Sequence, residues 1–353
     1  MDALTPMLRQ YRQVKADHPD AILMFRLGDF YEMFFDDALS ASKALSLTLT
    51  ARGRGTANEA PMCGVPYHAA DGYIARLVGQ GYRVAICDQV EDARQAKGIV
   101  RREVTRVVSP GTLTDPAHLQ AREPNFIAAI VGEAGPTGRA TTGPPGSAGS
   151  VAAGGIGAAM LDLSTGDFRL VEARGPGAAE TIADRLAGFA PREIVHPEGT
   201  RTADLLPADR LGDPLWTAAP TWRFAGDTAT RVLNERFGTV SLEGFGCDGK
   251  DLAVRAAGAL LGHLRDAQKA DLRHVTRLQV HEPGDGMGLD AVTRRTLEIV
   301  ANTRDGGRDG TLLEVVDRTR TAMGGRLLRD WLLRPLVARA PIEARLDAVA
   351  LLV

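Results

Sequence analysis

Two side chains near the start of the chain have the types and the spacing to act on a flat, polar partner. An apolar run from Ile22 to Leu27 is followed by a Gly-Asp pair and an aromatic run from Phe30 to Phe35. Glycine supplies the positive φ of a two-residue turn, so this pattern predicts a β-hairpin. Residues two apart on a strand share a face, which places Phe30 beside Glu32. The ring could wedge between nucleic-acid bases while the carboxylate accepts a hydrogen bond from a base edge.

The same residues also fit the start of a helix. Asp29 and Glu32 have the spacing of a capping box, with Asp29 as the N-cap. The helix would then bury a stripe made of Tyr31, Phe34, Phe35 and Ala38, and the aromatic residues would serve packing alone. Periodicity by itself favours this helical interpretation, so the choice depends on the rest of the chain.

Length, composition and charge limit the classes of protein to which these residues can belong. The chain has 353 residues, 44% hydrophobic and 24% charged, which is enough for two or three globular domains. Its 42 Lys and Arg against 44 Asp and Glu give a net charge of -2, so nucleic-acid binding must depend on local patches. Cys63, Cys87 and Cys247 lie far apart and indicate neither disulfides nor a zinc knuckle. The sequence begins with no signal peptide and has no apolar run of about 18 residues, so we expect a cytoplasmic protein without membrane insertion.

Residues 1–115 are predicted to form one mixed-sheet α/β domain. Helical spacing and end signals predict helices from Thr5 to about His18, from Ala38 to Leu45 and from Ala70 to Val78. Besides the hairpin, strands are predicted at 46–50, 82–87 and 101–108. The loop 51–55 carries two arginines on flexible glycines, and 61–69 is predicted to be a rigid connector.

Three motifs follow one another in this domain. They are Gly-Asp-Phe-Tyr-Glu at 28–32, Gly-Val-Pro-Tyr-His-Ala at 64–69 and Val-Ser-Pro-Gly-Thr at 108–112. In this order and spacing they resemble the mismatch-recognition domain of the MutS family of DNA mismatch repair proteins. The resemblance favours the hairpin over the helix and implies that Phe30 and Glu32 read mismatched DNA. It also implies possible DNA contacts from loops that match family regions near DNA, at Arg52, Arg54, Met62, Tyr67 and His68.

A second domain is predicted at 116–250. Its strands are expected at 126–131, 156–162, 166–171 and 193–196, and its helices at 178–186 and 227–237, the second with Asp227 as N-cap. The segment 132–155 is rich in Gly, Ala, Pro and Ser and is predicted to be a disordered loop. This succession is similar to the connector domain of MutS, and the resemblance implies an RNase H-like fold.

Two features in this region could indicate an enzyme. Asp162 occupies a predicted central strand, where an RNase H-type nuclease places a metal-binding carboxylate, but the sequence offers no convincing partner acids. The segment 244–251 fits Gly-x-x-x-x-Gly-Lys, yet Asp251 replaces the hydroxyl residue that holds Mg²⁺ and no buried strand precedes it. We therefore predict no catalytic, cofactor or metal site in this chain. A nuclease and a protein-docking scaffold remain the alternatives.

Residues 251–353 are predicted to be helical, with helices at 252–266, 289–299 and 321–336. They look like the opening of the MutS core domain. The expected fold class is therefore α/β multidomain: a mixed-sheet N-terminal domain, an RNase H-like connector domain and the start of an α-helical core domain. The sequence ends at Val353 within an apolar helical pattern, as either a fragment or a truncated gene product.

The family resemblance implies a role in DNA mismatch repair, through recognition of mispaired or unpaired bases in duplex DNA. In the family this recognition is coupled to a C-terminal ATPase that binds ATP and Mg, and no such motif is found in this chain, so we expect no enzyme activity from it. The implied partners are DNA with mismatches or small loops, a MutL-type protein that contacts the connector domain, and a second subunit in a full-length homodimer.

Overall fold

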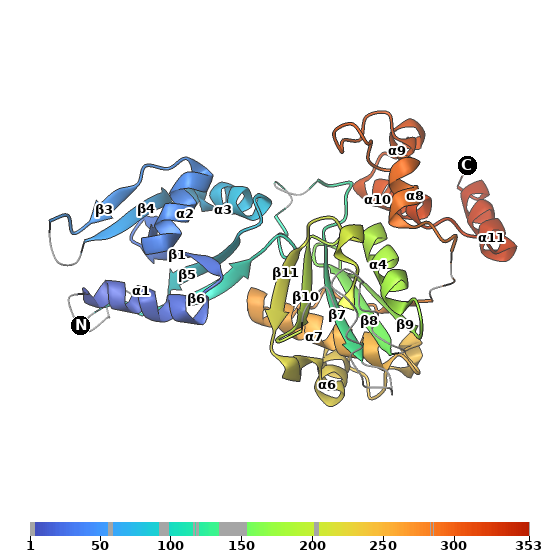
Figure 1. Cartoon of the computed structure of the whole chain (residues 1–353), viewed down its shortest axis with the longest axis horizontal. Helices are drawn as coiled ribbons and strands as arrows, with labels where there is room; N and C mark the ends of the chain where they lie inside the picture. Colours follow the sequence, from blue (N-terminus) through green and yellow to red (C-terminus); the bar gives the residue numbers. More distant parts are fainter. Residues whose placement is uncertain are drawn as a thin grey trace, which may run out of the picture. The chain divides into compact units, whose positions relative to one another are not determined.

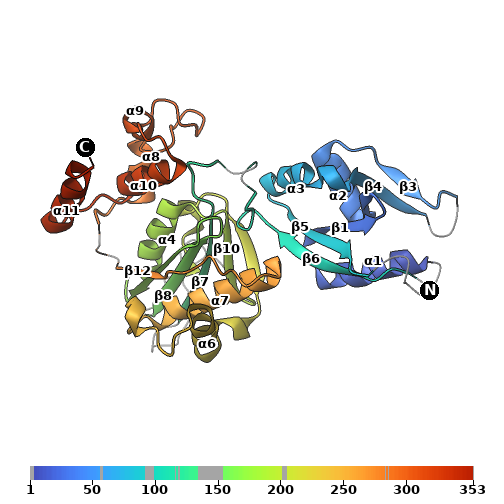
Figure 2. The ribbon, with the colours of Figure 1, turned by 180° about the vertical axis from the view of Figure 1, so that it is seen from behind.

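The computed structural model describes residues 4–55, 59–91, 99–115, 117, 120–133, 154–200, 205–282, 284 and 286–352. The chain divides into two compact units, one made of residues 1–118 with 264–272 and the other of 119–263 with 273–353. Figures 1 and 2 show the elements of both units from opposite sides. Each unit contains a six-stranded mixed sheet with helices, which confirms the α/β class.

The sheet of the first unit has the strand order β3-β4-β2-β1-β5-β6. Its strands are β1 (Ala21–Leu27), β2 (Phe30–Phe34), β3 (Thr50–Arg52), β4 (Ala60–Pro66), β5 (Arg83–Gln89) and β6 (Arg102–Val108). Only the pair β1 and β5 is parallel, and the other neighbours are antiparallel. The predicted hairpin, and the strands expected near 82–87 and 101–108, are confirmed.

Helices cover both faces of this sheet. They are α1 (Pro6–Asp17), α2 (Phe35–Leu45) and α3 (Ala70–Gly79), the last preceded by the short helix η1 (Tyr67–Ala69). One core cluster joins Leu8 and Tyr11 of α1 to Phe25 and Phe34, whereas a second joins α2 and α3 to the alternate strand residues. Because side chains alternate across a strand, α1 lies on one face and α2 with α3 on the other.

Three sequence predictions in this unit were wrong. The segment 61–69 is not a connector, because most of it forms strand β4. The strand predicted at 46–50 begins only at Thr50, since Ser46 caps α2 in the left-handed conformation with φ 57°. Helix α2 starts at Phe35 and not at Ala38. Phe35 has φ 54°, an uncommon value for a residue with a side chain, and this conformation turns the chain from strand β2 directly into the helix.

The sheet of the second unit has the order β11-β10-β7-β8-β9-β12. Its strands are β7 (Phe126–Glu133), β8 (Gly155–Asp162), β9 (Asp167–Arg174), β10 (Glu193–Pro197), β11 (Leu215–Ala219) and β12 (Gln279–His281). Strands β7, β8 and β9 are antiparallel neighbours, while β10 runs parallel to β7, β11 to β10 and β12 to β9. The short strands β11 and β12 were not predicted. Of the loop predicted at 132–155, the two ends belong to β7 and β8, and 134–153 lie outside the described residues.

Helices also flank this second sheet. They are α4 (Ala178–Phe189), α6 (Gly226–Phe237) and α7 (Asp251–Gln268), with the short helices η2 (Ala208–Arg210), η3 (Thr221–Phe224) and η4 (Glu243–Phe245). Helix α4 packs in one cluster with Ile156 and Ala158 of β8. Gly157, between them, faces the other way, and a Cβ there would lie 2.1 Å from the backbone of Leu252 in α7. Asp227 is not the N-cap of α6, because Ala225 occupies that position.

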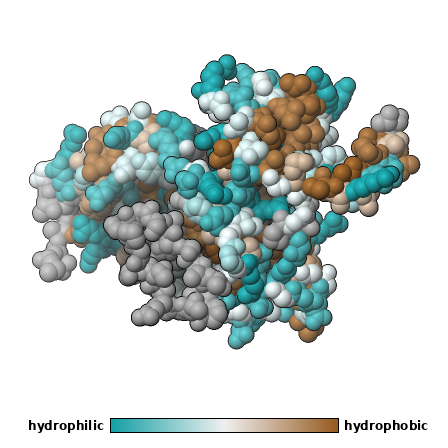
Figure 3. All heavy atoms as spheres, turned by 45° about the vertical axis from the view of Figure 1, so that its right-hand side comes forward, coloured by the Kyte–Doolittle hydropathy of each residue, from teal (hydrophilic) through white to brown (hydrophobic). Residues whose placement is uncertain are grey.

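The remaining helices follow β12. They are α8 (Ala291–Thr296), α9 (Leu312–Val316), α10 (Ala322–Leu333) and α11 (Arg339–Ala350). Helix α10 begins where Thr321 Oγ1 accepts a hydrogen bond from Gly324 N. Helix α8 is shorter than predicted and α9 was missed. Many large apolar side chains of this region are exposed, as the hydropathy surface shows in Figure 3. In the described part of the chain no helix is long and apolar enough to cross a membrane.

Candidate nucleic-acid interface

The hairpin of β1 and β2 presents Phe30 at its tip. Leu27 pairs with Phe30 across a two-residue turn, and the first turn residue, Gly28, has φ 59°. A positive φ at that position is what a type II′ hairpin turn requires. The capping-box helix is excluded, because residues 30–34 form a strand. Phe30 is 47% exposed.

Burial along β2 changes in steps on the face that carries Phe30. Phe34, four residues further along, is fully buried under α1. Glu32, between the two, has 16% of its side chain exposed, and Phe30 is exposed at the end. Tyr31 and Met33 point to the opposite face and are buried with α2 and α3. The strand is thus anchored at one end and offers a ring and a carboxylate at the other.

Glu32 is held by residues of β4, the strand next to β2, and of β3, the strand beyond it. It pairs with Gly64 of β4, where a Cβ would lie 3.4 Å from Glu32 Cγ, so the absence of a side chain lets Glu32 lie over the strand. Arg52 of β3 donates from Nη1 to Glu32 Oε2 at 2.8 Å. The structure therefore brings two of the predicted site residues, Glu32 and Arg52, into direct contact.

The opposite face braces the turn. Arg26 stacks on the exposed ring of Tyr67, with its guanidinium carbon 3.7 Å from the ring centre, and donates from Nε to Gly28 O at 2.5 Å. Tyr67 N donates to Asp29 O at 2.9 Å. The carbonyl of Gly28 is therefore bonded to β1 and that of Asp29 to the start of η1, which restricts the motion of Phe30.

The base of the hairpin is fixed by a buried carboxylate. Asp37 accepts hydrogen bonds from Tyr11 Oη at 2.6 Å, Lys15 Nζ at 2.8 Å and Leu23 N at 3.1 Å. These donors come from α1 and β1, whereas Asp37 belongs to α2. Burial and the nearby Asp37 raise the pKa of Tyr11 well above its ordinary value, so its hydroxyl remains a donor.

The remaining predicted contacts lie around the hairpin but are not assembled into one cluster. Arg54 and His68 are exposed, as is Tyr67 on the face that carries α2 and α3. Met62 is half-buried and packs against the α1 cluster, so it contributes to the core. Among the described residues, Arg54 makes no ion pair. Arg26 and Gly64 were missed because their roles depend on cross-strand register, and Asp37 because its role depends on the packing of α2 against α1 and β1. The signal that could have located Gly64 was its place in the quoted motif.

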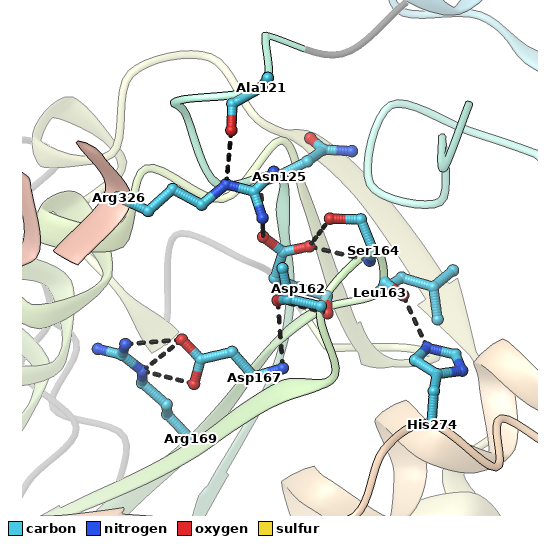
Figure 4. A network of polar contacts seen from close by, with 10 residues as sticks. Ala121, Asn125, Asp162, Leu163, Ser164, Asp167, Arg169, His274 and Arg326 are labelled. Atoms are coloured by element: carbon cyan, nitrogen blue, oxygen red, sulfur yellow. Dashed lines mark hydrogen bonds and ion pairs between the residues drawn. The ribbon is translucent and has the colours of Figure 1, made fainter. Parts of the chain in front are cut away.

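Asp162 does not have the surroundings of a nuclease carboxylate. It is 1% exposed; its Oδ1 accepts from Ser164 N at 2.9 Å and Ser164 Oγ at 2.6 Å, and its Oδ2 from Asn125 N at 3.3 Å. Arg326 of α10 lies 4.0 Å from Oδ2, and Figure 4 shows these groups converging on the carboxylate. Asp162 thus fixes the β8–β9 turn. No group of three or more His, Cys, Asp or Glu in the described ranges is placed to hold a metal ion.

The Gly-x-x-x-x-Gly-Lys segment lies between two helices. It follows α6 and overlaps the last two residues of η4, and Asp251 is the first residue of α7. A phosphate-binding loop follows a β-strand, so the segment lacks the surroundings that the motif needs. Lys250 Nζ is 2.9 Å from a carboxylate oxygen of Glu282.

Comparison with known proteins gives consistent matches along the chain. Family models match in order: MutS domain I at residues 5–117, MutS domain II at 125–276 and MutS domain III at 292–353. The DNA mismatch repair protein MutS of Symbiobacterium thermophilum is 45% identical over 351 residues, which cover 99% of this chain and 38% of the relative. The protein of the same name from Myxococcus xanthus is 46% identical over 350 residues, covering 98% of this chain and 37% of the relative.

The order of the three matched domains, the identity along almost the whole chain and the hairpin with its Phe-x-Glu pair agree with one another. The chain spans well under half the length of these curated relatives. It belongs to the MutS family of DNA mismatch repair proteins and contains the regions matched by domains I, II and III.

Proposed function

We propose that this chain recognises mispaired or unpaired bases in duplex DNA, with Phe30 and Glu32 as the reading residues. The observation that carries the proposal is the exposed ring of Phe30 at the tip of a braced hairpin, next to a carboxylate on the same face. The exposure also supports a DNA reader over a pure protein scaffold, in which this ring would be buried.

The proposed mechanism uses the lower stability of a mismatch. Phe30 enters the minor groove, stacks on the faulty base and helps to kink the duplex. Unstacking costs a few kcal/mol per step and less at a mispaired base, so the deformability of the DNA discriminates. Glu32 then accepts or shares a hydrogen bond with the displaced base. Its negative charge opposes close approach to ordinary duplex, which lowers non-specific affinity.

Other exposed side chains would help to position the DNA. Arg54 and His68 are exposed and could contact phosphate oxygens, and Tyr67 with its stacked Arg26 lies close to the turn. Met62 is half-buried against the core, so we place it behind the surface that contacts DNA. Arg52 already forms an ion pair with Glu32, whereas Arg54 forms none with a described residue.

We further propose the finer architecture that the resemblance implies. The second sheet would be RNase H-like, which is supported by three antiparallel strands, β7 to β9, followed by β10 and β11 on the other side of β7. Residues 251–353 would begin the helical core domain, and the domain limits 1–115, 116–250 and 251–353 stay predictions. For the whole protein we propose a homodimer in the cytoplasm, a MutL-type partner at the connector domain, and an ATPase that uses ATP and Mg outside this chain.

Phe30→Ala tests the proposal. The variant should lose the preference for mismatched over matched duplex, because stacking of an aromatic side chain on a base contributes about 1–3 kcal/mol. Binding of the complete protein to G·T, unpaired-T and matched duplexes of one sequence is measured by fluorescence anisotropy. The matched control is Leu39→Ala, which removes another side chain that is 47% exposed, on α2 at the opposite face. A Phe30→Ala protein with unchanged discrimination would show that this ring is not the wedge.

A further inference from the structure

The ion pair between Arg52 and Glu32 spans an intervening strand. Glu32 belongs to β2 and Arg52 to β3, and β4 lies between them. Glu32 is opposite Gly64, whereas Arg52 is opposite Ala60, four residues before Gly64 in β4. Neighbouring strands are about 4.8 Å apart, so both side chains must extend diagonally to reach 2.8 Å.

The register fixes the direction in which the Glu32 carboxylate is held. Phe30 is opposite Pro66, at the end of β4 that follows Gly64, and Ala60 is at the other end. Arg52 therefore lies on the far side of Glu32 from Phe30. Gly64 leaves the space over β4 that the Glu32 side chain occupies on this path.

The ion pair also changes the charge that a duplex would meet. A carboxylate beside a guanidinium repels phosphates less than an unpaired carboxylate does, because the two charges partly cancel. Arg52 is 46% exposed and Glu32 16%, so the pair is accessible and its exchange for another partner is inexpensive. Arg54, two residues away, has the same charge and no ion pair with a described residue.

We infer that Arg52 is a residue that sets mismatch specificity by acting through Glu32: it holds the carboxylate away from Phe30 and neutralises it, and reading a mismatch exchanges this ion pair for a hydrogen bond to the base. The inference rests on the proposed function. It gives Arg52 a role different from a phosphate contact, and the two roles predict opposite changes in discrimination.

The test compares Arg52→Gln with Arg54→Gln in the complete protein, on matched and G·T duplexes. In Arg52→Gln, Glu32 has no ion pair to break and its full charge opposes the matched duplex. The ratio of mismatched to matched affinity should therefore rise, by about two- to fivefold for an exposed ion pair. Arg54→Gln, which removes a proposed phosphate contact, should weaken binding to both duplexes alike and so leave the ratio, though not the affinity, unchanged. Arg52→Lys, which keeps a cation, should stay near the wild-type ratio. Thermal unfolding checks that the variants fold.

Dependence on Glu32 separates the two roles. In a Glu32→Ala background, Arg52→Gln should no longer change the ratio. Equal loss of affinity for both duplexes in Arg52→Gln, as expected for a phosphate contact, would overturn the inference. It would also be overturned if Arg52→Gln changed the ratio by the same factor in the Glu32→Ala background as in the wild type. If Phe30→Ala abolishes discrimination while Arg52→Gln leaves it unaltered, only this inference fails. A wild-type protein without mismatch preference removes the proposed function and the inference with it.

Discussion

At the scale of single residues, the exposed ring of Phe30 at the hairpin tip contributes less to folding stability than a buried ring would. Full burial of a phenylalanine side chain contributes about 1.5–3 kcal/mol, and Phe30, with 47% of its surface exposed, gains only part of this. Arg26 and Tyr67 compensate by fixing the turn through its two carbonyls. An exposed ring on a rigid support loses little further entropy on binding, because it is already ordered.

Glu32→Ala should tighten binding to matched duplex. The substitution removes a negative charge from the DNA-facing surface, and it also releases the guanidinium of Arg52 for a phosphate. One new phosphate contact steepens the dependence of log affinity on log salt by about 0.9. Titrations of matched duplex by anisotropy at several salt concentrations measure both effects.

The control for this variant is Asp71→Ala, which removes an acid that is 73% exposed on α3, at the face opposite Glu32. It should leave both the affinity and the salt dependence close to those of the wild type. Matched-duplex affinity in Glu32→Ala no higher than in this control would contradict the role assigned to the charge.

At the scale of elements, local sequence signals located most helices and strands but not the paths between them. Helix α1 was predicted from its Thr5-Pro6 start, and Thr5 Oγ1 does accept from Leu8 N. Strand β4 was missed because prolines at 61 and 66 and Gly64 read locally as a connector. It is a strand because both of its sides pair, with β2 and with β3. Such non-local pairing decides the structure of a segment with weak strand propensity.

The sequence alone could place Phe30 and Glu32 together, because residues two apart on a strand share a face. It could not pair Glu32 with Arg52, since that contact depends on the register of two further strands. The burial of the Asp37 carboxylate, which joins α2 to α1 and β1, was not predicted either, because it depends on how these elements pack.

Asp37→Ala should therefore loosen the base of the hairpin. The substitution leaves Lys15 Nζ and the hydroxyl of Tyr11 without their shared acceptor. Leaving buried donors without their acceptor costs about 1–3 kcal/mol. Urea unfolding measures the loss. Asp36→Ala is the control, because the neighbouring Asp36 is exposed and should contribute less than about 0.5 kcal/mol. Equal losses in the two variants would refute the anchoring role.

At the scale of the whole molecule, charged groups far apart in sequence hold parts of the second unit together. Asp317 accepts from Arg122 Nη1 at 2.9 Å and from Arg308 Nη2 at 2.5 Å, as well as from Thr319 N and Oγ1. Arg169 of β9 contacts Asp330 of α10 at 2.9 Å. Periodicity along the chain cannot reveal contacts over such separations, which only the folded unit defines.

Asp317 should make this unit sensitive to acid. Hydrogen bonds from Thr319 and Arg308 hold the pKa of its carboxyl well below the usual range. A lowered folded pKa adds stability above the unfolded pKa of about 3.9, and this stability is lost as the pH falls toward the folded value. Asp317→Asn should therefore lower the free energy of unfolding at pH 7 and shrink the difference between pH 7 and pH 3.

Urea unfolding at a series of pH values measures this dependence. Asp309→Asn is the control, because Asp309 is an exposed acid of the same region. It should keep the wild-type difference between pH 7 and pH 3. An Asp317→Asn protein with that same difference would show that the carboxyl does not link this unit to pH.

The exposed apolar side chains in and after the C-terminal helices should affect the solubility of the polypeptide. Met323 is 81% exposed, Leu346 62% and Leu351 87%. Water-facing apolar area of this kind favours self-association. Concentrated samples should turn cloudy, adhere to vessel walls and bind fluorescent hydrophobic dyes, and a mild detergent should keep them clear.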